Sequence, residues 1–179
     1  MDYYDQLSTG YNELYGDEQR AKFTFVKDWL AALEGQSLDV GAGTGLINEF
    51  YAPTVLLDSS FGMLSKAKGV QVVADARFLP FKDQSFDNIT CFTVLQDIIN
   101  KKQVIAELVR VVRDKILITV LKKLKSREEL TSLFKGLTVL DYREEEKDHC
   151  FLLSKIEPEQ LIIVPEKEVK EERLKLITY

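Results

Sequence analysis

A glycine-rich loop and three aspartates are the residues whose types and spacing could bind a ligand. The loop spans residues 41–45 and reads G-A-G-T-G, and Asp39 stands two residues before it. Glycine has no Cβ, so a ligand can approach this backbone closely. Asp58 and Asp75 each follow a later apolar run. A carboxylate at Asp58 can accept hydrogen bonds from both hydroxyls of a ribose, and one at Asp75 can accept a bond from the exocyclic amine of adenine.

The loop lacks the spacing of a phosphate-binding loop. A P-loop needs G-x-x-x-x-G-K-[ST], and no Lys-Ser/Thr pair follows here. A dinucleotide fingerprint needs G-x-G-x-x-G, but Leu46 stands where the third glycine would be, counting from Gly41. Asp39 would also repel a pyrophosphate and attract an amino group or another cation. The pattern therefore disfavours a nicotinamide dinucleotide and favours a ligand with a cationic group near the loop.

Alternating strands and helices are expected to position these residues. Short apolar runs predict seven strands, at 37–40, 54–57, 70–74, 86–92, 116–121, 137–144 and 150–154. Helical spacing or capping predicts helices at 17–34, 46–51, 59–68, 102–113 and 126–134. This order predicts a Rossmann-like, doubly wound, mainly parallel seven-stranded sheet with helices on both faces and a C-terminal antiparallel hairpin. Ligands of such sheets bind outside the carboxyl ends of the strands.

The whole chain of 179 residues is expected to form a single domain. It divides into a helical cap (1–36), a core (37–155) and a C-terminal extension (156–179). In the extension, 161–164 could form a strand and 166–177 a charged helix or an exposed segment. The net charge of -5 disfavours a general binder of nucleic acid.

The remaining composition predicts a cytoplasmic protein without a membrane span. No apolar run approaches the roughly 18 residues that a transmembrane helix needs, and the acidic, aromatic first residues are neither a signal nor a transit peptide. Cys91 and Cys150 are expected to be buried reduced thiols, and His149 an ordinary structural histidine. No metal site is expected.

Over about residues 3–155 the sequence resembles the class I S-adenosylmethionine-dependent methyltransferases. LDVGAGTG (38–45) resembles their first motif, LLDSSFGML (56–64) their second, and VVADARFLPFKDQSFDNI (72–89) their third and fourth. The resemblance implies S-adenosylmethionine as cofactor and S-adenosylhomocysteine as product. It implies that the loop contacts the methionine part, that Asp58 binds the ribose, and that Asp75 and Ala76 bind the adenine. The tyrosine-rich start resembles many small members, in which Tyr3 or Tyr11 would cover the methionine end. The full set of expected cofactor-binding residues is Tyr11, Asp39, Gly41, Ala42, Gly43, Thr44, Gly45, Asp58, Ser59, Met63, Asp75, Ala76 and Phe92.

The methyl acceptor is less well defined by the sequence. Methyl transfer mainly requires alignment of a nucleophile with the methyl group, and a base only if the nucleophile arrives protonated. Gln96 and Asp97 follow the fourth strand, so we expect them to face the acceptor, with Asp97 as a candidate base. The tetrapeptide N-P-P-[YF] is missing here, which disfavours transfer to adenine N6, cytosine N4 or a glutamine amide. LQDI (95–98) replaces the LHHI of many relatives, and no LKPGG precedes the fifth strand.

Three acceptor classes stay open: tRNA or rRNA, a small molecule, and a protein. YNELYGDEQ (11–19) resembles RNA methyltransferases that work with a small zinc-binding activator subunit, which would then be a partner. The basic run 122–127 could contact RNA phosphates, or it could simply be a solvated helix start. The alternatives to a methyltransferase are a non-catalytic cofactor-binding scaffold or activator subunit and, from another class, an NAD-dependent oxidoreductase.

Overall fold

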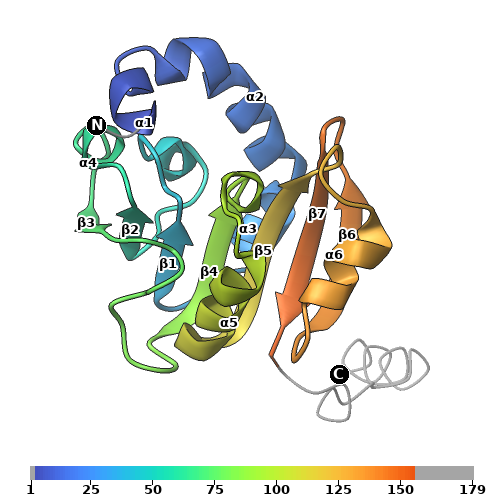
Figure 1. The fold of residues 1–179 in the computed structure, drawn as a ribbon. Helices are drawn as coiled ribbons and strands as arrows, with labels where there is room; N and C mark the ends of the chain where they lie inside the picture. Colours follow the sequence, from blue (N-terminus) through green and yellow to red (C-terminus); the bar gives the residue numbers. More distant parts are fainter. Residues whose placement is uncertain (1–2, 156–179) are drawn as a thin grey trace, which may run out of the picture.

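A computed structural model describes residues 3–155 of the chain as one mixed sheet with helices on both faces (Figure 1). The strand order is β3-β2-β1-β4-β5-β7-β6. Its strands are β1 (Ser37–Val40), β2 (Val55–Asp58), β3 (Val70–Val73), β4 (Phe86–Phe92), β5 (Val112–Leu121), β6 (Thr138–Glu144) and β7 (Asp148–Ser154). The first five pair in parallel, and β7 pairs antiparallel with both β5 and β6. The predicted sheet and its terminal hairpin are therefore confirmed, whereas the strand and helix considered at 161–164 and 166–177 lie outside the described residues.

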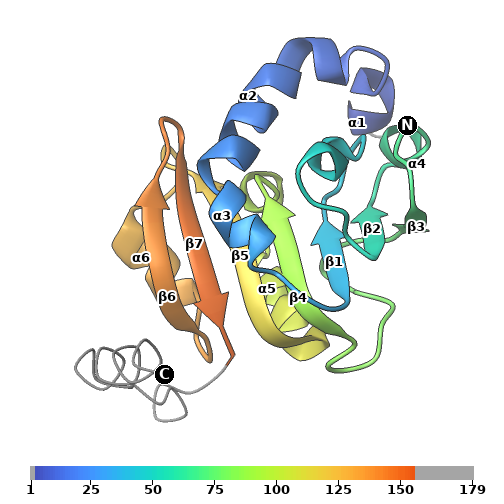
Figure 2. The same ribbon diagram turned by 180° about the vertical axis from the view of Figure 1, so that it is seen from behind.

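The helices occupy both faces and one end of the sheet. They are α1 (Tyr3–Leu7), α2 (Tyr11–Phe25), α3 (Lys27–Ala31), α4 (Phe61–Leu64), α5 (Lys101–Val111) and α6 (Arg127–Leu133), with 3₁₀ turns η1 (Leu46–Glu49) and η2 (Leu95–Asp97). Figure 1 shows α5 and α6 in front of the sheet, and Figure 2 shows α3 on the opposite face. In both views α2 crosses the end toward which the parallel strands point. Within residues 3–155 no helix is both long and apolar enough to cross a membrane.

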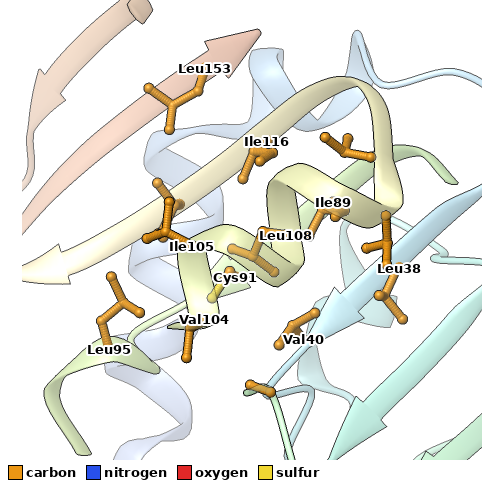
Figure 3. Close-up of a cluster of buried hydrophobic side chains, with 14 of the residues drawn as sticks. Leu38, Val40, Ile89, Cys91, Leu95, Val104, Ile105, Leu108, Ile116 and Leu153 are labelled. Carbon is orange, nitrogen blue, oxygen red and sulfur yellow. The ribbon is translucent and has the colours of Figure 1, made fainter. Parts of the chain in front are cut away.

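Alternating strand residues build a separate apolar core on each face of the sheet. Successive side chains of a strand point to opposite faces. Leu38 and Val40 of β1 pack with Leu108 of α5 (Figure 3). On the other face Leu117 packs in a cluster with Leu30 of α3. Burial of this apolar surface is the main force that holds the helices against the sheet.

The single helix predicted at 17–34 is wrong in its bounds. It is two helices, α2 and α3, which meet at Val26, whose backbone φ and ψ of -111° and 18° leave the helical range. The break follows two aromatic residues and a threonine, Phe23 to Phe25, which have modest helix propensity. Asp17 consequently lies inside α2 rather than capping it. The break allows α3 to lie flat on the sheet while α2 extends over the strand ends (Figure 2).

Three other predicted elements differ in type or by more than two residues at one end. The helix predicted at 59–68 is only α4, although its serine cap is confirmed, since the Ser60 hydroxyl accepts a bond from the Met63 N–H. The turn predicted as a helix at 46–51 is the 3₁₀ turn η1. Strand β5 begins at Val112, four residues earlier than predicted, directly after α5 ends. At α6, Ser126 and Glu129 form a complete capping box, as the sequence motif indicates.

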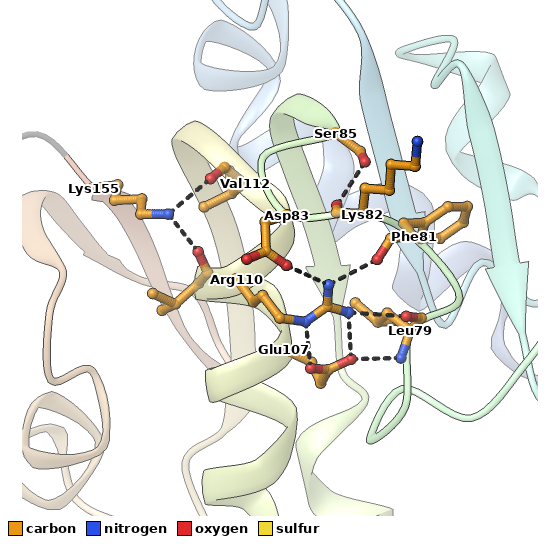
Figure 4. Close-up of polar contacts among 10 residues, drawn as sticks. Leu79, Phe81, Lys82, Asp83, Ser85, Glu107, Arg110, Val112 and Lys155 are labelled. Atoms are coloured by element: carbon orange, nitrogen blue, oxygen red, sulfur yellow. Dashed lines mark hydrogen bonds and ion pairs between the residues drawn. The ribbon is translucent and has the colours of Figure 1, made fainter.

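Arg110 of α5 anchors the long connection between β3 and β4 (Figure 4). Its guanidinium donates to the carbonyl oxygens of Leu79 and Phe81, at 2.9 and 2.7 Å. It also pairs with Asp83 and Glu107, and the Glu107 carboxylate in turn accepts the Leu79 N–H at 2.7 Å. This network satisfies backbone groups that no strand or helix pairs, so it fixes the segment that follows Asp75.

A buried ion pair connects α2 to β7 and to the end of β4. Lys22 and Asp148 are both fully buried, and Lys22 Nζ lies 2.8 Å from Asp148 Oδ2. The same ammonium donates to the Thr93 hydroxyl. Burial raises the pKa of Asp148, and the neighbouring ammonium of Lys22 opposes that effect. Each charge is therefore tolerated in the interior because the other is present.

We predict that Lys22→Met destabilises the protein by about 3–5 kcal/mol, because it leaves the Asp148 carboxylate buried without its cation. Urea unfolding measures this loss. Lys125→Met is the matched control, because its ammonium pairs with the exposed Glu129 and should contribute less than about 1 kcal/mol. The double variant Lys22→Met/Asp148→Leu should recover much of the stability. A single Lys22 variant as stable as the control would contradict the assigned role.

Candidate functional site

Two adjoining cavities open where the parallel strands end. The first, here called the loop cavity, has a volume of about 390 Å³ and is lined by the glycine loop and by residues after β2, β3 and β4. The second, here called the tyrosine cavity, has a volume of about 650 Å³ and is lined by α1, α2 and residues after β4 and β5. Four residues line both cavities: Tyr4, Tyr11, Thr93 and Asp97. Two ligands bound in these cavities would therefore meet at the end of β4.

The glycine loop turns sharply beneath the loop cavity. The N–H groups of Gly41 and Ala42 both donate to the carbonyl of Leu57, at 2.8 and 3.0 Å. Gly41 has a φ of +77°, and a Cβ there would lie 2.2 Å from a methyl carbon of Val94. Both the backbone conformation and the space therefore demand glycine at this position.

Asp58 at the end of β2 is held in place by backbone donors. Its Oδ2 accepts the Gly43 N–H at 2.8 Å, and its Oδ1 accepts the Ser60 N–H at 2.9 Å. The carboxylate lines the loop cavity. These two bonds orient the carboxylate, whose oxygens are of the type that accepts hydroxyl groups from a ligand.

Asp39 lies below the loop instead of lining either cavity. It is buried in β1, and its Oδ1 accepts the Thr90 hydroxyl at 2.6 Å. Burial raises the pKa of Asp39 to about 7, although the bond from Thr90 acts in the opposite direction. A cation that approached the loop from the cavity would favour the ionised carboxylate.

Asp75, after β3, is already engaged by a neighbouring cation. Its two oxygens accept bonds from the Arg77 guanidinium, and Oδ1 also accepts the Arg77 N–H at 2.8 Å. These contacts lower the pKa of Asp75, so the carboxylate is ionised at neutral pH. Asp75 and Ala76 both line the loop cavity.

The boundary between the two cavities is built from tyrosine and acid side chains. The Tyr4 hydroxyl donates to Asp97 Oδ2 at 2.7 Å. Burial and this bond raise the pKa of Tyr4, and burial beside Asp58 raises the pKa of Tyr11 to about 12. Both phenols are therefore neutral hydrogen-bond donors at physiological pH.

Gln96 presents an unsatisfied acceptor at this boundary. Its amide nitrogen donates to the carbonyl of Thr93, a residue whose φ of +57° is unusual outside glycine. This bond fixes the orientation of the amide, because a carbonyl can accept only from the nitrogen. Gln96 Oε1 then has no partner within residues 3–155, and the side chain lines the tyrosine cavity.

Most of the residues expected to bind the cofactor meet in the loop cavity. Those that line it are Tyr11, Gly41, Gly43, Asp58, Ser59, Met63, Asp75, Ala76 and Phe92. Four others do not: Asp39, Ala42, Thr44 and Gly45. Thr44 instead donates to Asn12 of α2 at 2.6 Å, which ties the loop to the helical cap. A direct cofactor contact from these four stays a prediction.

Of the two residues expected to face the acceptor, Asp97 lines both cavities, and Gln96 lines only the tyrosine cavity.

The sequence did not identify Tyr4, Thr93, Val94 and Arg77 as residues that line the loop cavity. The available signals were that Thr93 and Val94 directly follow β4 and that Tyr4 lies in the tyrosine-rich start. Cys91 and Cys150 are confirmed as buried free thiols. His149 is buried, with its Nδ1 2.9 Å from the Tyr142 hydroxyl, and lines neither cavity.

A comparison with family models identifies a methyltransferase domain within the chain. The model for methyltransferase domains matches residues 38–118, which include the glycine loop, Asp58 and Asp75. Over these residues the chain is therefore similar to methyltransferase domains. Among curated proteins it is 40% identical over 98 residues to the demethylmenaquinone methyltransferase of Renibacterium salmoninarum, a match that covers 49% of this chain and 41% of that protein. The chain thus spans less than half the length of this relative.

Solved structures of methyltransferases share the fold. An S-adenosylmethionine-dependent methyltransferase of Thermotoga maritima superposes with a TM-score of 0.72 at 17% identity, covering 86% of this chain and 98% of the other. A complex between the Trm112 methyltransferase activator of Haloferax volcanii and a methyltransferase gives a TM-score of 0.71 at 14% identity, covering 88% and 99%. At these identities the likeness concerns the fold alone.

We predict a pH dependence of stability from Asp39, seen by comparing the protein with Asp39→Asn. The folded pKa of about 7 lies above the ordinary value of 3.8. Between these values the folded state therefore binds more protons than the unfolded state. Raising the pH should then destabilise the native protein relative to Asp39→Asn by up to about 1.4 kcal/mol per pH unit. Urea unfolding from pH 4 to 8 should show the difference growing up to pH 7 and levelling off above it. A constant difference would show that Asp39 ionises normally.

Proposed function

We propose that this protein transfers a methyl group from S-adenosylmethionine to an acceptor bound in the tyrosine cavity. The observation that carries the proposal is the pair of adjoining cavities that share Tyr11, Thr93 and Asp97. The loop cavity has the glycine loop and two carboxylates, Asp58 and Asp75, of the type that binds a nucleoside. The tyrosine cavity adjoins it. A direct transfer between two bound molecules needs this arrangement, because the reacting atoms must be held in line.

The residues of the loop cavity fit S-adenosylmethionine in chemical type. Asp58 has acceptor capacity for the ribose hydroxyls, and Asp75 for the adenine amine beside its bond to Arg77. Met63 and Phe92 supply apolar surface for the adenine and ribose. Leu46 is buried in η1 where a dinucleotide fingerprint requires glycine, which counts against the oxidoreductase alternative.

Bound S-adenosylmethionine would supply a methyl carbon already activated by a sulfonium. The task of the protein is then to align the acceptor and to remove water from the transfer path. Asp97 lies where the cavities meet, so its carboxylate can take the proton of an acceptor that arrives protonated. The Tyr4 hydroxyl that donates to Asp97 holds this carboxylate in position.

We also propose a binding partner, an acceptor class and a cellular location for this protein. The fold shared with the methyltransferase of the Trm112 complex supports a small activator as a partner of this chain. RNA as acceptor is supported by Lys122 and Lys123, which line the tyrosine cavity. Of the other cations in this basic run, Lys125 pairs with Glu129, and Arg127 lies over the Tyr142 ring, 4.1 Å from its centroid. A cytoplasmic location stays a prediction from the sequence.

We expect S-adenosylhomocysteine to bind the wild-type protein and NADH not to bind, as measured by isothermal titration calorimetry. Asp58→Ala should weaken S-adenosylhomocysteine binding by about tenfold or more, since it removes charge-assisted hydrogen bonds to the ribose. Asp97→Ala should weaken it much less. The exposed Asp17, paired with Arg20 at 3.5 Å, provides the control Asp17→Ala. Equal losses at Asp58 and Asp97 would show that the two roles are wrongly assigned.

Incubation with methyl-labelled S-adenosylmethionine and separate RNA, protein and metabolite fractions of a cell extract tests the transfer itself. Label in one fraction that depends on Asp97 would support an enzyme. Cofactor binding without label in any fraction, with an activator subunit added, would instead support the scaffold alternative.

A further inference from the structure

We propose that the tyrosine cavity binds a planar aromatic acceptor that carries an N–H or O–H nucleophile at one end and an anionic group at the other. The proposal rests on the proposed function, because it assigns the substrate class of the same site. Three independent features of the cavity support it: its aromatic walls, its hydrogen-bond acceptors and its lysines.

The walls of the cavity are aromatic on the side of the helical cap. The rings of Tyr3 and Tyr4 meet edge to face with centroids 5.3 Å apart, and those of Tyr11 and Tyr15 lie 5.3 Å apart in a tilted arrangement. All four line the cavity, and Leu121 at the end of β5 adds apolar surface. Aromatic side chains gain most by stacking on, or meeting edge-on, another flat ring. The volume of about 650 Å³ lies within the range of cavities that hold ligands of several tens of atoms.

The end of the cavity next to the methyl site offers acceptors. Gln96 Oε1 is buried and has no partner within residues 3–155, and its amide cannot turn without losing the bond to Thr93. Asp97 adds a carboxylate at the same end. The Asp97 carboxylate can accept hydrogen bonds but cannot donate them. The complementary group is a donor, so the nucleophile arrives as an N–H or O–H, and Asp97 can take its proton as the methyl–sulfur bond breaks.

The lining beyond β5 is cationic. Three lysines line the cavity, Lys122, Lys123 and Lys147, whereas only two acids do, Glu18 and Asp97. Lys147 is paired with Glu18 at 2.6 Å, and Lys122 lies 3.6 Å from Glu144. No ion pair to Lys123 is found in the described part of the chain. The cavity therefore has an excess of positive charge away from Asp97, and an anionic substituent of the acceptor would complement it.

The same walls could hold a cationic amine by contact with the tyrosine faces. Lys122, Lys123 and Lys147 disfavour that occupant, because they repel a second cation. Two sources share the favoured chemistry: free aromatic acids, and nucleoside monophosphates, in which the base is the ring and the phosphate the anion. The test below contains one arm for each source.

The test uses the protein saturated with S-adenosylhomocysteine, so that only the tyrosine cavity is open, and measures binding by calorimetry. The first arm compares 3-(4-hydroxyphenyl)propionate with its neutral amide, its 4-methoxy analogue and the cation tyramine. The second arm compares guanosine and adenosine 5′-monophosphates with the nucleosides. In at least one arm the anionic member should bind about tenfold more tightly than its neutral counterpart, as expected for one charge-assisted contact. The hydroxyl compound should likewise exceed the methoxy analogue if the aromatic acids bind.

Variants locate the contacts. Lys122→Ala/Lys123→Ala should reduce the affinity for the anionic probe to that of its neutral counterpart and leave the neutral probe unchanged. Gln96→Leu should lower the affinity for both. Lys125→Ala, whose side chain does not line the cavity, is the matched control.

The proposal is overturned if no probe binds the saturated protein, if neutral and anionic members bind equally, or if tyramine binds most tightly. In each of these cases S-adenosylhomocysteine still binds, so the proposed methyltransferase function survives. Failure of S-adenosylhomocysteine to bind would instead remove the proposed function itself.

Discussion

The buried contact of Lys22 with Asp148 and Thr93 is the interaction on which the arrangement of this site depends. It joins three parts of the chain that are far apart in sequence: α2, the start of β7, and the residue after β4. A charge buried at this depth is strongly unfavourable alone, so the three parts are stable only together. Thr93 belongs to both cavities, which means that the position of the helical cap and the shape of the site are set by one group of contacts.

Much of the fold could be predicted from the sequence because its determinants are local. Strand β4 has the predicted bounds, and the caps of α4 and α6 use the serines that the motifs indicate. The break at Val26 and the early start of β5 were missed, because packing against the sheet decides them and short-range propensity does not. Asp39 shows the same limit: its type and spacing indicated a place beside the loop, but only the fold shows that the Thr90 hydroxyl donates to it.

The sequence identifies the residues of the loop cavity more completely than those of the tyrosine cavity. The loop cavity is built from strand ends that follow one another in the chain, so a spacing pattern can identify Gly41, Asp58 and Asp75. The tyrosine cavity draws on α1, the turn after β4, the end of β5 and the β6–β7 turn. No spacing rule connects Tyr4 with Asp97, and only the folded chain brings them within 2.7 Å.

Tyr4 and Tyr11 form a wall that the two cavities share, and this has a thermodynamic consequence. A ligand that shifts either ring in one cavity alters the surface offered to the ligand in the other. Any such effect on affinity is reciprocal, since the coupling free energy is the same whichever ligand binds first. The strength of the coupling between cofactor and acceptor is then a property of helices α1 and α2, and substitutions there can change it without touching the glycine loop.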